Sequence, residues 1–139
     1  MRSSTTIIAT IVAALISSAN GHHGVSSEMD LTEFSQVRGI IKDIEWINPH
    51  VVVYVAVDQG TVFEKEWIIH MDSPSDLLTR GLSRDFFMDL SDIEFTVYHY
   101  KSFRCEEKCM GWGSEALDST GVMHVLTKDL YEAVNELSL

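Results

Sequence analysis

The spacing of hydrophobic positions changes several times along this chain, and each change predicts a different element. Residues 51–57 (VVVYVAV) form the densest run of β-branched side chains, which is typical of a central strand. Gly39 interrupts one of the other apolar segments, which is the pattern of a β-bulge. Alternation of apolar and polar side chains predicts four further strands, at residues 34–46, 61–71, 93–100 and 121–127.

Two short helices are predicted, one between the third and fourth strands and one at the end of the chain. Ser73 and Pro74 suit the cap and the first position of a helix, and Gly81 is a good terminator. Apolar side chains return at helical spacing within residues 129–137. Residues 105–120 carry glycines and serines between two predicted strands, so we expect a loop there.

This order of elements predicts a mainly β protein with one domain. Three strands, a helix and two strands are the order of a small five-stranded OB-like Greek-key barrel, with a short helix between strands 3 and 4 and a short C-terminal helix. A plain antiparallel sheet covered by one helix is the alternative. The chain of 139 residues has room for a single domain, which we assign to residues 22–139 with an extended N-terminal segment.

The first 21 residues have the composition of a secretory signal peptide rather than of the folded domain. Their apolar run, residues 7–16, is well below the ~20 residues that a helix needs to span a bilayer. Small residues follow it, as signal cleavage requires. Cleavage after Gly21 would place His22 at the new N-terminus, and cleavage after Ala19 is the alternative. An uncleaved N-terminal anchor is the other interpretation of this segment.

The charge of the chain excludes two classes of partner. Twenty-one Asp and Glu residues against ten Lys and Arg give a formal net charge of −11. Loss of residues 1–21, where Arg2 is the only charged residue, would make it −12. Nucleic acids and anionic lipid surfaces need a basic binding face, so neither is expected as a partner. Together with the signal peptide, this predicts an acidic periplasmic or secreted protein that does not span a membrane after processing.

Three short motifs follow one another along the chain. Two histidines stand at positions 22 and 23, W-x-N-P-H at 46–50, and S-P-x-x-L-x-x-R at 73–80. In this order the motifs resemble a family of small exported bacterial proteins of unknown function, over residues 22–100. The resemblance implies export and a small β domain, and it draws attention to the histidines without implying an activity. Leu82 departs from the family pattern, which tends to have Trp there.

The motif histidines are the candidate metal ligands. A chain that begins at His22 carries an α-amine and an imidazole on one residue, and these two nitrogens can chelate one metal ion. His50, with His23 as a substitute, would supply a further imidazole, and such an all-nitrogen set suits Cu(II). Cleavage after Ala19 would instead place His22 third in the chain, which also chelates Cu(II). A mobile N-terminus with incidental histidines is the alternative.

Other residues with reactive or polar side chains have simpler interpretations. In an exported protein, the thiols of Cys105 and Cys109 are expected to form a disulfide, with a soft metal such as Cu(I) as the alternative. The three remaining histidines lie in predicted strands and are expected to be ordinary strand residues: His70, His99 and His124. Weaker candidate binding residues come from the same motifs as His50, and these are Trp46, Asn48 and Arg80.

The sequence predicts a binding protein rather than an enzyme. It contains no phosphate-cradling loop, no G-x-S-x-G and no H-E-x-x-H. We therefore expect an exported metal-binding protein, with copper as its cofactor, that handles or senses metal and has a metal ion and a periplasmic protein as partners. The alternative is a non-enzymatic module that binds a protein or an oligosaccharide through its barrel face and residues 101–120. A metal-dependent oxidase is a third hypothesis.

Overall fold

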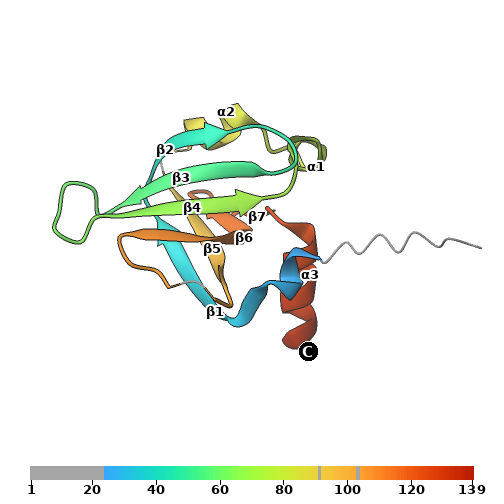
Figure 1. Cartoon of the computed structure of the whole chain (residues 1–139). Helices are drawn as coiled ribbons and strands as arrows, with labels where there is room; N and C mark the ends of the chain where they lie inside the picture. The colour runs from blue at the N-terminus through green and yellow to red at the C-terminus, as the bar shows by residue number, and fades with distance from the viewer. Residues whose placement is uncertain (1–23, 91, 103) are drawn as a thin grey trace, which may run out of the picture.

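A computed structural model of the chain (Figure 1) describes residues 24–90, 92–102 and 104–139. The predicted signal peptide, His22 and His23 lie outside this range. The protein is mainly β, with seven strands in one sheet that does not close and with short helices. The elements in chain order are η1 (Val25–Ser27), β1 (Met29–Arg38), β2 (Ile40–Glu45), β3 (Val51–Val57), β4 (Lys65–Met71), α1 (Pro74–Thr79), α2 (Arg84–Asp89), β5 (Ile93–Tyr100), β6 (Lys108–Asp118), β7 (Met123–Val125) and α3 (Lys128–Leu137).

The sheet has the strand order β1-β5-β6-β4-β3-β2, and β7 pairs with β6. All pairs are antiparallel except β4 and β6, which run parallel. The two ends of this order, β1 and β2, are consecutive in the chain and are separated only by Gly39. A Cβ at Gly39 would overlap the carbonyl group of Ala56, so a residue with a side chain does not fit at this bend.

The sheet buries side chains on both faces. The main core lies between the strands and the helices α1 and α2, which Figure 1 shows at the top of the molecule. A second, smaller cluster lies on the outer face under α3 and consists of Met29, Tyr98, Trp112 and Leu130. Val25 of η1 and Val134 of α3 pack against this second cluster, which therefore joins the two ends of the described chain.

Local signals predicted two of the three α-helices in the described part of the chain. The Ser73 hydroxyl accepts a hydrogen bond from the Asp76 backbone N–H at 3.2 Å, and Pro74 occupies the first helical position of α1. Gly81 follows with a φ of +78°, which glycine adopts without strain. The predicted C-terminal helix is α3, which begins one residue earlier than expected. The helix α2, capped by the Ser83 hydroxyl, was not predicted.

The prediction of a loop at residues 105–120 was wrong, because most of this segment is the long strand β6. Its glycines reflect close packing rather than a turn. A Cβ at Gly111 would overlap the carbonyl of Tyr98, and a Cβ at Gly113 would lie 2.9 Å from Leu126 Cδ1. With β6, and with the first predicted strand divided at Gly39, the sheet has seven strands instead of the expected five.

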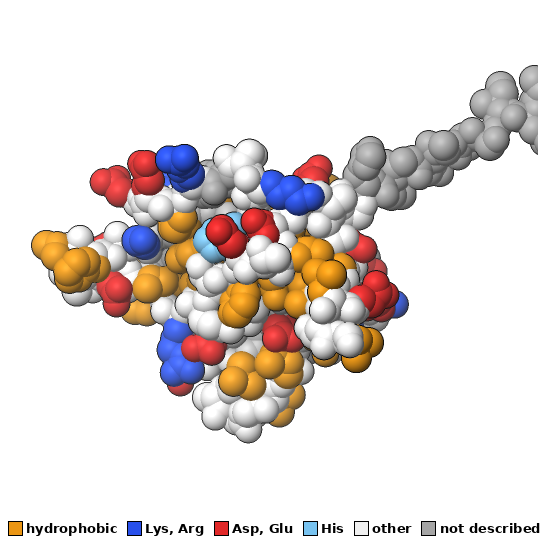
Figure 2. Space-filling view, turned by 90° about the horizontal axis from the view of Figure 1, so that it is seen from below, with side chains coloured by type: hydrophobic (Ala, Val, Ile, Leu, Met, Phe, Trp, Pro, Cys, Tyr) orange, Lys and Arg blue, Asp and Glu red, His pale blue; other side chains and the backbone are white. Residues whose placement is uncertain are grey.

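The ends of other strands also differ from expectation. β1 begins at Met29, within the segment expected to be an irregular extension, and β4 begins at Lys65 rather than at residue 61. Phe63, which lies in the predicted strand 61–71, is instead in the β3–β4 loop and is 74% exposed beside Val62. Hydrophobic side chains gather at the projecting end of the molecule, on the left in Figure 2. Among the described residues, none of the helices has the length and hydropathy needed to cross a membrane.

Candidate functional site

The histidine of the W-x-N-P-H motif lines a pocket with a volume of about 460 Å³. His50 is exposed and directly precedes β3, as expected for a residue that follows an Asn-Pro turn. The pocket brings together three parts of the chain that are far apart in the sequence. It is lined by Gly24, Val25 and Glu28, by Pro49 and His50, and by Trp112 and Asp129.

The first turn of α3 holds the N-terminal segment at this pocket. The Asp129 carboxylate accepts a hydrogen bond from the backbone N–H of Ser26 at 3.0 Å. A Cβ at Gly24 would lie 2.7 Å from Asp129 Oδ2, so the chain passes this close because residue 24 has no side chain. His23 is bonded directly to Gly24, and His22 precedes it. The pocket that contains His50 is therefore also the place where the described chain begins.

Trp112 contacts two histidines on the outer face of the sheet. Its ring centroid lies 4.7 Å from that of His50, edge to face, and 5.5 Å from that of His70. The indole Nε1 donates a hydrogen bond to the Tyr100 hydroxyl at 2.7 Å, which fixes the ring. His70 and Trp112 are register partners in the parallel β4–β6 pair. We call these two residues the Trp112 pair.

His70 contacts Trp112, which lines the pocket, although sequence analysis expected it to be an ordinary strand residue. Burial lowers the pKa of His70, and the neighbouring His50 imidazole lowers it further, whereas the Glu45 carboxylate raises it. A lowered pKa favours the neutral ring, which is the form that binds metals. Its Nε2 is buried, and no described residue forms a hydrogen bond with it. The one available signal was parity, since residue 70 faces away from the core that Trp67 enters.

The other strand histidines have partners, as expected of ordinary strand residues. His99 lies edge-on to Trp67 with ring centroids 5.5 Å apart, and its Nε2 lies 2.8 Å from the Ser35 hydroxyl. We call His99 and Trp67 the Trp67 pair. His124 Nε2 lies 2.7 Å from Asp118 Oδ2, and this hydrogen bond is the main reason that the pKa of Asp118 lies well below its usual range.

Two of the weaker candidate binding residues lie near His50 in sequence but do not line the pocket. Trp46 is half-buried and packs against Phe87 of α2, with ring centroids 6.4 Å apart. Asn48 is exposed in the turn before His50. The two cysteines lie apart from the pocket, before and within β6, and they are at disulfide distance with Cα atoms 4.6 Å apart, as predicted.

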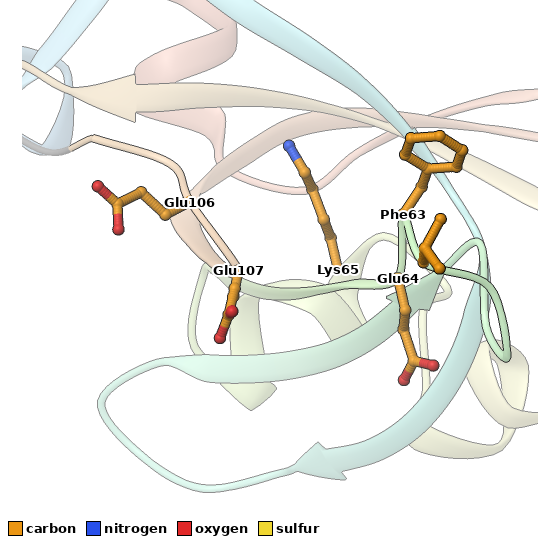
Figure 3. A pocket seen from close by; sticks show the side chains of 6 residues that line it. Phe63, Glu64, Lys65, Glu106 and Glu107 are labelled. Carbon is orange, nitrogen blue, oxygen red and sulfur yellow. The ribbon is translucent and has the colours of Figure 1, made fainter.

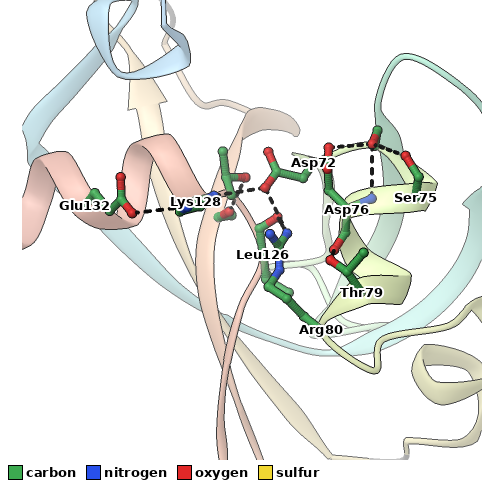
Figure 4. A network of polar contacts seen from close by, with 11 residues as sticks. Asp72, Ser75, Asp76, Thr79, Arg80, Leu126, Lys128 and Glu132 are labelled. Carbon is green, nitrogen blue, oxygen red and sulfur yellow. Dashed lines mark hydrogen bonds and ion pairs between the residues drawn. The ribbon is translucent and has the colours of Figure 1, made fainter.

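Arg80, the third weaker candidate, belongs to a polar network that joins helices to the sheet (Figure 4). Its Nη2 donates a hydrogen bond to Asp72 Oδ2 at 2.8 Å and another to the Leu126 carbonyl at 3.3 Å. Asp72 Oδ2 also accepts the backbone N–H of Lys128 at 3.0 Å. The network therefore ties the end of α1 to the end of β4 and to the start of α3. This position gives Arg80 a structural role in holding α3 against the sheet.

A second hollow of about 360 Å³ lies where the β3–β4 loop meets the segment before β6 (Figure 3). Figure 3 shows the Lys65 side chain between those of Glu106 and Phe63. The side chains of Glu64 and Glu107 point away from Lys65. These charged side chains are not arranged around a common point. Across residues 24–90, 92–102 and 104–139, no three His, Cys, Asp or Glu side chains form a group that could hold a metal ion by themselves.

Comparison with known proteins gives a family but not an activity. A model of a family of unknown function, DUF6152, matches residues 9–106. The chain belongs to this family. The matched range includes His22, His23, His50 and His70 but ends before β6, so Trp112 lies beyond it. No curated protein and no solved structure matches the chain. The function is therefore argued from the pocket itself.

Proposed function

We propose that this protein binds a metal ion, with Cu(II) as the preferred metal, at the pocket that contains His50. The α-amine and imidazole of His22 would chelate the ion, the His50 imidazole would complete the set, and His23 is the substitute ligand. Amine and imidazole nitrogens are ligands that suit Cu(II). The role that fits such a site is metal handling or sensing.

The observation that carries this proposal is that Gly24 and His50 line the same pocket. Consecutive Cα atoms are about 3.8 Å apart, so a residue one or two positions before Gly24 could reach His50 if the chain turned into the pocket. The hydrogen bond between Ser26 and Asp129 supports this placement, because it holds the segment just after the histidines. The ion would then be held by His50 from the start of β3 and by the amine and imidazole of the processed N-terminus.

The proposal includes export, cleavage after Gly21, and a periplasmic or secreted location. The apolar run at residues 7–16 and the small residues after it support a cleaved signal peptide. Cleavage matters chemically because the α-amine of His22 becomes a ligand only when it begins the chain. Cleavage after Ala19 would produce a different chelate from the same histidine.

We also propose that the sheet is an OB-like barrel. If β1 and β2 are counted as one strand bent at Gly39, and the three-residue β7 is set aside, five strands remain. Helices lie between the third and fourth of these, and the third and fifth run parallel, which supports this topology. The bent first strand then pairs with neighbours at both ends of the strand order.

Cu(II) titration of the processed protein tests the metal proposal. The chain is expressed in full in a bacterial host, its N-terminus is read by mass spectrometry, and Cu(II) is added with EPR detection. We expect a nitrogen-rich signal that is lost in His50→Ala and in a variant with one residue added before His22. His124→Ala, which removes a histidine partnered by Asp118, is the matched control. Equally weak binding in all these proteins would contradict the proposal and favour the non-metal binding module.

A further inference from the structure

His70 and His50 are neighbours across two paired strands. Val51 pairs with Met71, and Val52 pairs with His70. His50 is two residues before Val52 and on the same face, so it is the diagonal neighbour of His70. The hydrogen bond from the Val51 backbone N–H to the Asp72 carbonyl, at 3.2 Å, carries the pairing on to this end of the ladder. Diagonal side chains on one face of an antiparallel pair have Cβ atoms within about 7–8 Å of each other, which is within reach of one ion bound between two rings.

The Nε2 atom of His70 lacks a hydrogen-bond partner among the described residues although it is buried. Burial without a partner costs free energy, so each such atom in a folded protein calls for an explanation, such as a bound ion. The other such atom among the described residues, Arg80 Nε, belongs to a guanidinium group that is already held through its Nη2 by Asp72. The orphaned nitrogen is the one that imidazoles commonly use to bind metals. Trp112 contacts both rings, so the two histidines share one aromatic neighbour on β6.

We infer that His70 is a second imidazole ligand of the metal ion that His50 binds. This inference rests on the proposed function, because it adds a ligand to the same site. Strand β4 and the start of β3 would hold the two imidazoles in place, and imidazole nitrogens are ligands that suit Cu(II).

His99 provides a matched control within the same sheet. It is also half-buried in a strand and also contacts a tryptophan, with ring centroids 5.5 Å apart as in the Trp112 pair, although edge-on rather than tilted. Its Nε2 is already bonded to the Ser35 hydroxyl at 2.8 Å, and His50 does not contact it. Substitution of His99 therefore removes the same chemical group without touching the proposed site.

Cu(II) binding to His70→Gln and His99→Gln tests the inference. Loss of an outer-shell partner costs a metal site about 10- to 100-fold in affinity, so loss of a ligand should cost at least as much. We expect His70→Gln to weaken Cu(II) binding by this factor and to remove one nitrogen from the EPR hyperfine pattern, whereas His99→Gln keeps wild-type affinity and spectrum. Unchanged binding and hyperfine structure in His70→Gln would overturn the inference.

The outcomes also separate this inference from the proposed function. If His50→Ala loses copper and His70→Gln does not, only the role of His70 fails. If the wild-type protein with its native N-terminus binds no copper, the proposed function fails and the inference fails with it. If His70→Gln does not fold, a crystal structure of the wild-type protein with Cu(II) decides. Nε2 of His70 should then lie about 2.0 Å from the ion, as imidazole ligands do, and a longer separation overturns the inference.

Discussion

The Trp67 pair and the Trp112 pair place the same two residue types on the same sheet with different results. In the Trp67 pair, the tryptophan enters the main core and the His99 Nε2 bonds to Ser35. In the Trp112 pair, both residues lie on the outer face, and the His70 Nε2 has no partner in the described part of the chain. Only the Trp112 pair touches another histidine, His50, and a pocket.

This difference shows that a histidine beside a tryptophan has no fixed role. The hydroxyl of Ser35 satisfies His99, so nothing remains to be explained there. On the outer face, the second cluster provides apolar surroundings without a hydrogen-bond partner for His70. In the Trp67 pair the histidine therefore has a hydrogen-bond partner within the protein. In the Trp112 pair the buried His70 Nε2 has no such partner among the described residues, and the pair lies beside the pocket that we propose as the metal site.

The largest expected effect comes from removal of either tryptophan. Both side chains are 6% exposed, and truncation of a buried tryptophan to alanine costs about 3–5 kcal/mol of stability. We expect Trp67→Ala and Trp112→Ala to lower the free energy of unfolding by similar amounts, measured by urea denaturation. Only Trp112→Ala should also weaken Cu(II) binding, because only Trp112 contacts His50 and His70.

A conservative variant separates the effect of the Trp112 ring from the effect of its hydrogen bond to Tyr100. Trp112→Phe keeps an aromatic ring but loses the Nε1 hydrogen bond to Tyr100, which contributes about 1 kcal/mol. It should retain most of the Cu(II) affinity that Trp112→Ala loses. A Trp67→Ala protein that loses Cu(II) as fully as Trp112→Ala would show that the two pairs are not independent.

The parts of the fold that were predicted from sequence depend on local signals. The bounds of β3 and β5 agree with the predicted strands because dense β-branched residues and strict alternation mark them. The start of α1 was predicted because Ser73 caps the helix and Pro74 occupies its first position, and both effects depend only on residues nearby in the sequence. β6 was missed because Gly111 and Gly113 accommodate strands and side chains that are distant in sequence.

In the candidate site, too, local features were predicted and long-range contacts were not. The position of His50 directly before β3 was predicted because Asn48 and Pro49 form the turn that precedes it. His70 and Trp112 were not predicted as a pair, because only the parallel pairing of β4 with β6 brings them together. The missing hydrogen-bond partner of His70 is likewise a property of the folded surroundings. Sequence could indicate parity, but not which strand lies next to which.

His124 extends the comparison to a histidine whose partner is a carboxylate, that of Asp118, and this contact predicts how stability changes at low pH. Hydrogen bonds from His124 and Thr120 hold the pKa of Asp118 below its ordinary value of 3.8. A carboxylate with a lowered folded-state pKa stabilises the protein above about pH 4, and this contribution disappears as the pH falls through the folded-state pKa. In thermal melts, the wild-type protein should therefore lose its advantage over Asp118→Asn as the pH decreases from about 5 to about 2. A constant difference would contradict this assignment.

Ser35→Ala makes the Trp67 pair resemble the Trp112 pair. It leaves the His99 Nε2 without its hydroxyl partner, and loss of such a hydrogen bond costs about 1 kcal/mol. We expect this decrease in the free energy of unfolding. Cu(II) binding should be unchanged, because the Trp67 pair has no second histidine with which His99 could hold an ion. Ser35→Thr keeps the hydroxyl and should lose less. An acquired Cu(II) signal in Ser35→Ala would show that an orphaned imidazole alone binds copper, which would weaken the case for His50.

The smallest expected effect tests whether α3 positions the N-terminal ligands. Asp129→Ala removes the acceptor for the Ser26 N–H and an acidic residue from the first turn of α3, where such a charge contributes about 0.3–1 kcal/mol. Stability should fall by about that amount, while Cu(II) binding should weaken because the segment that begins at Gly24 is no longer held at the pocket. Asp129→Asn keeps an oxygen acceptor without the charge and should retain the Cu(II) affinity. If Asp129→Asn weakens binding as much as Asp129→Ala does, the carboxylate acts through its charge and not through the hydrogen bond from Ser26.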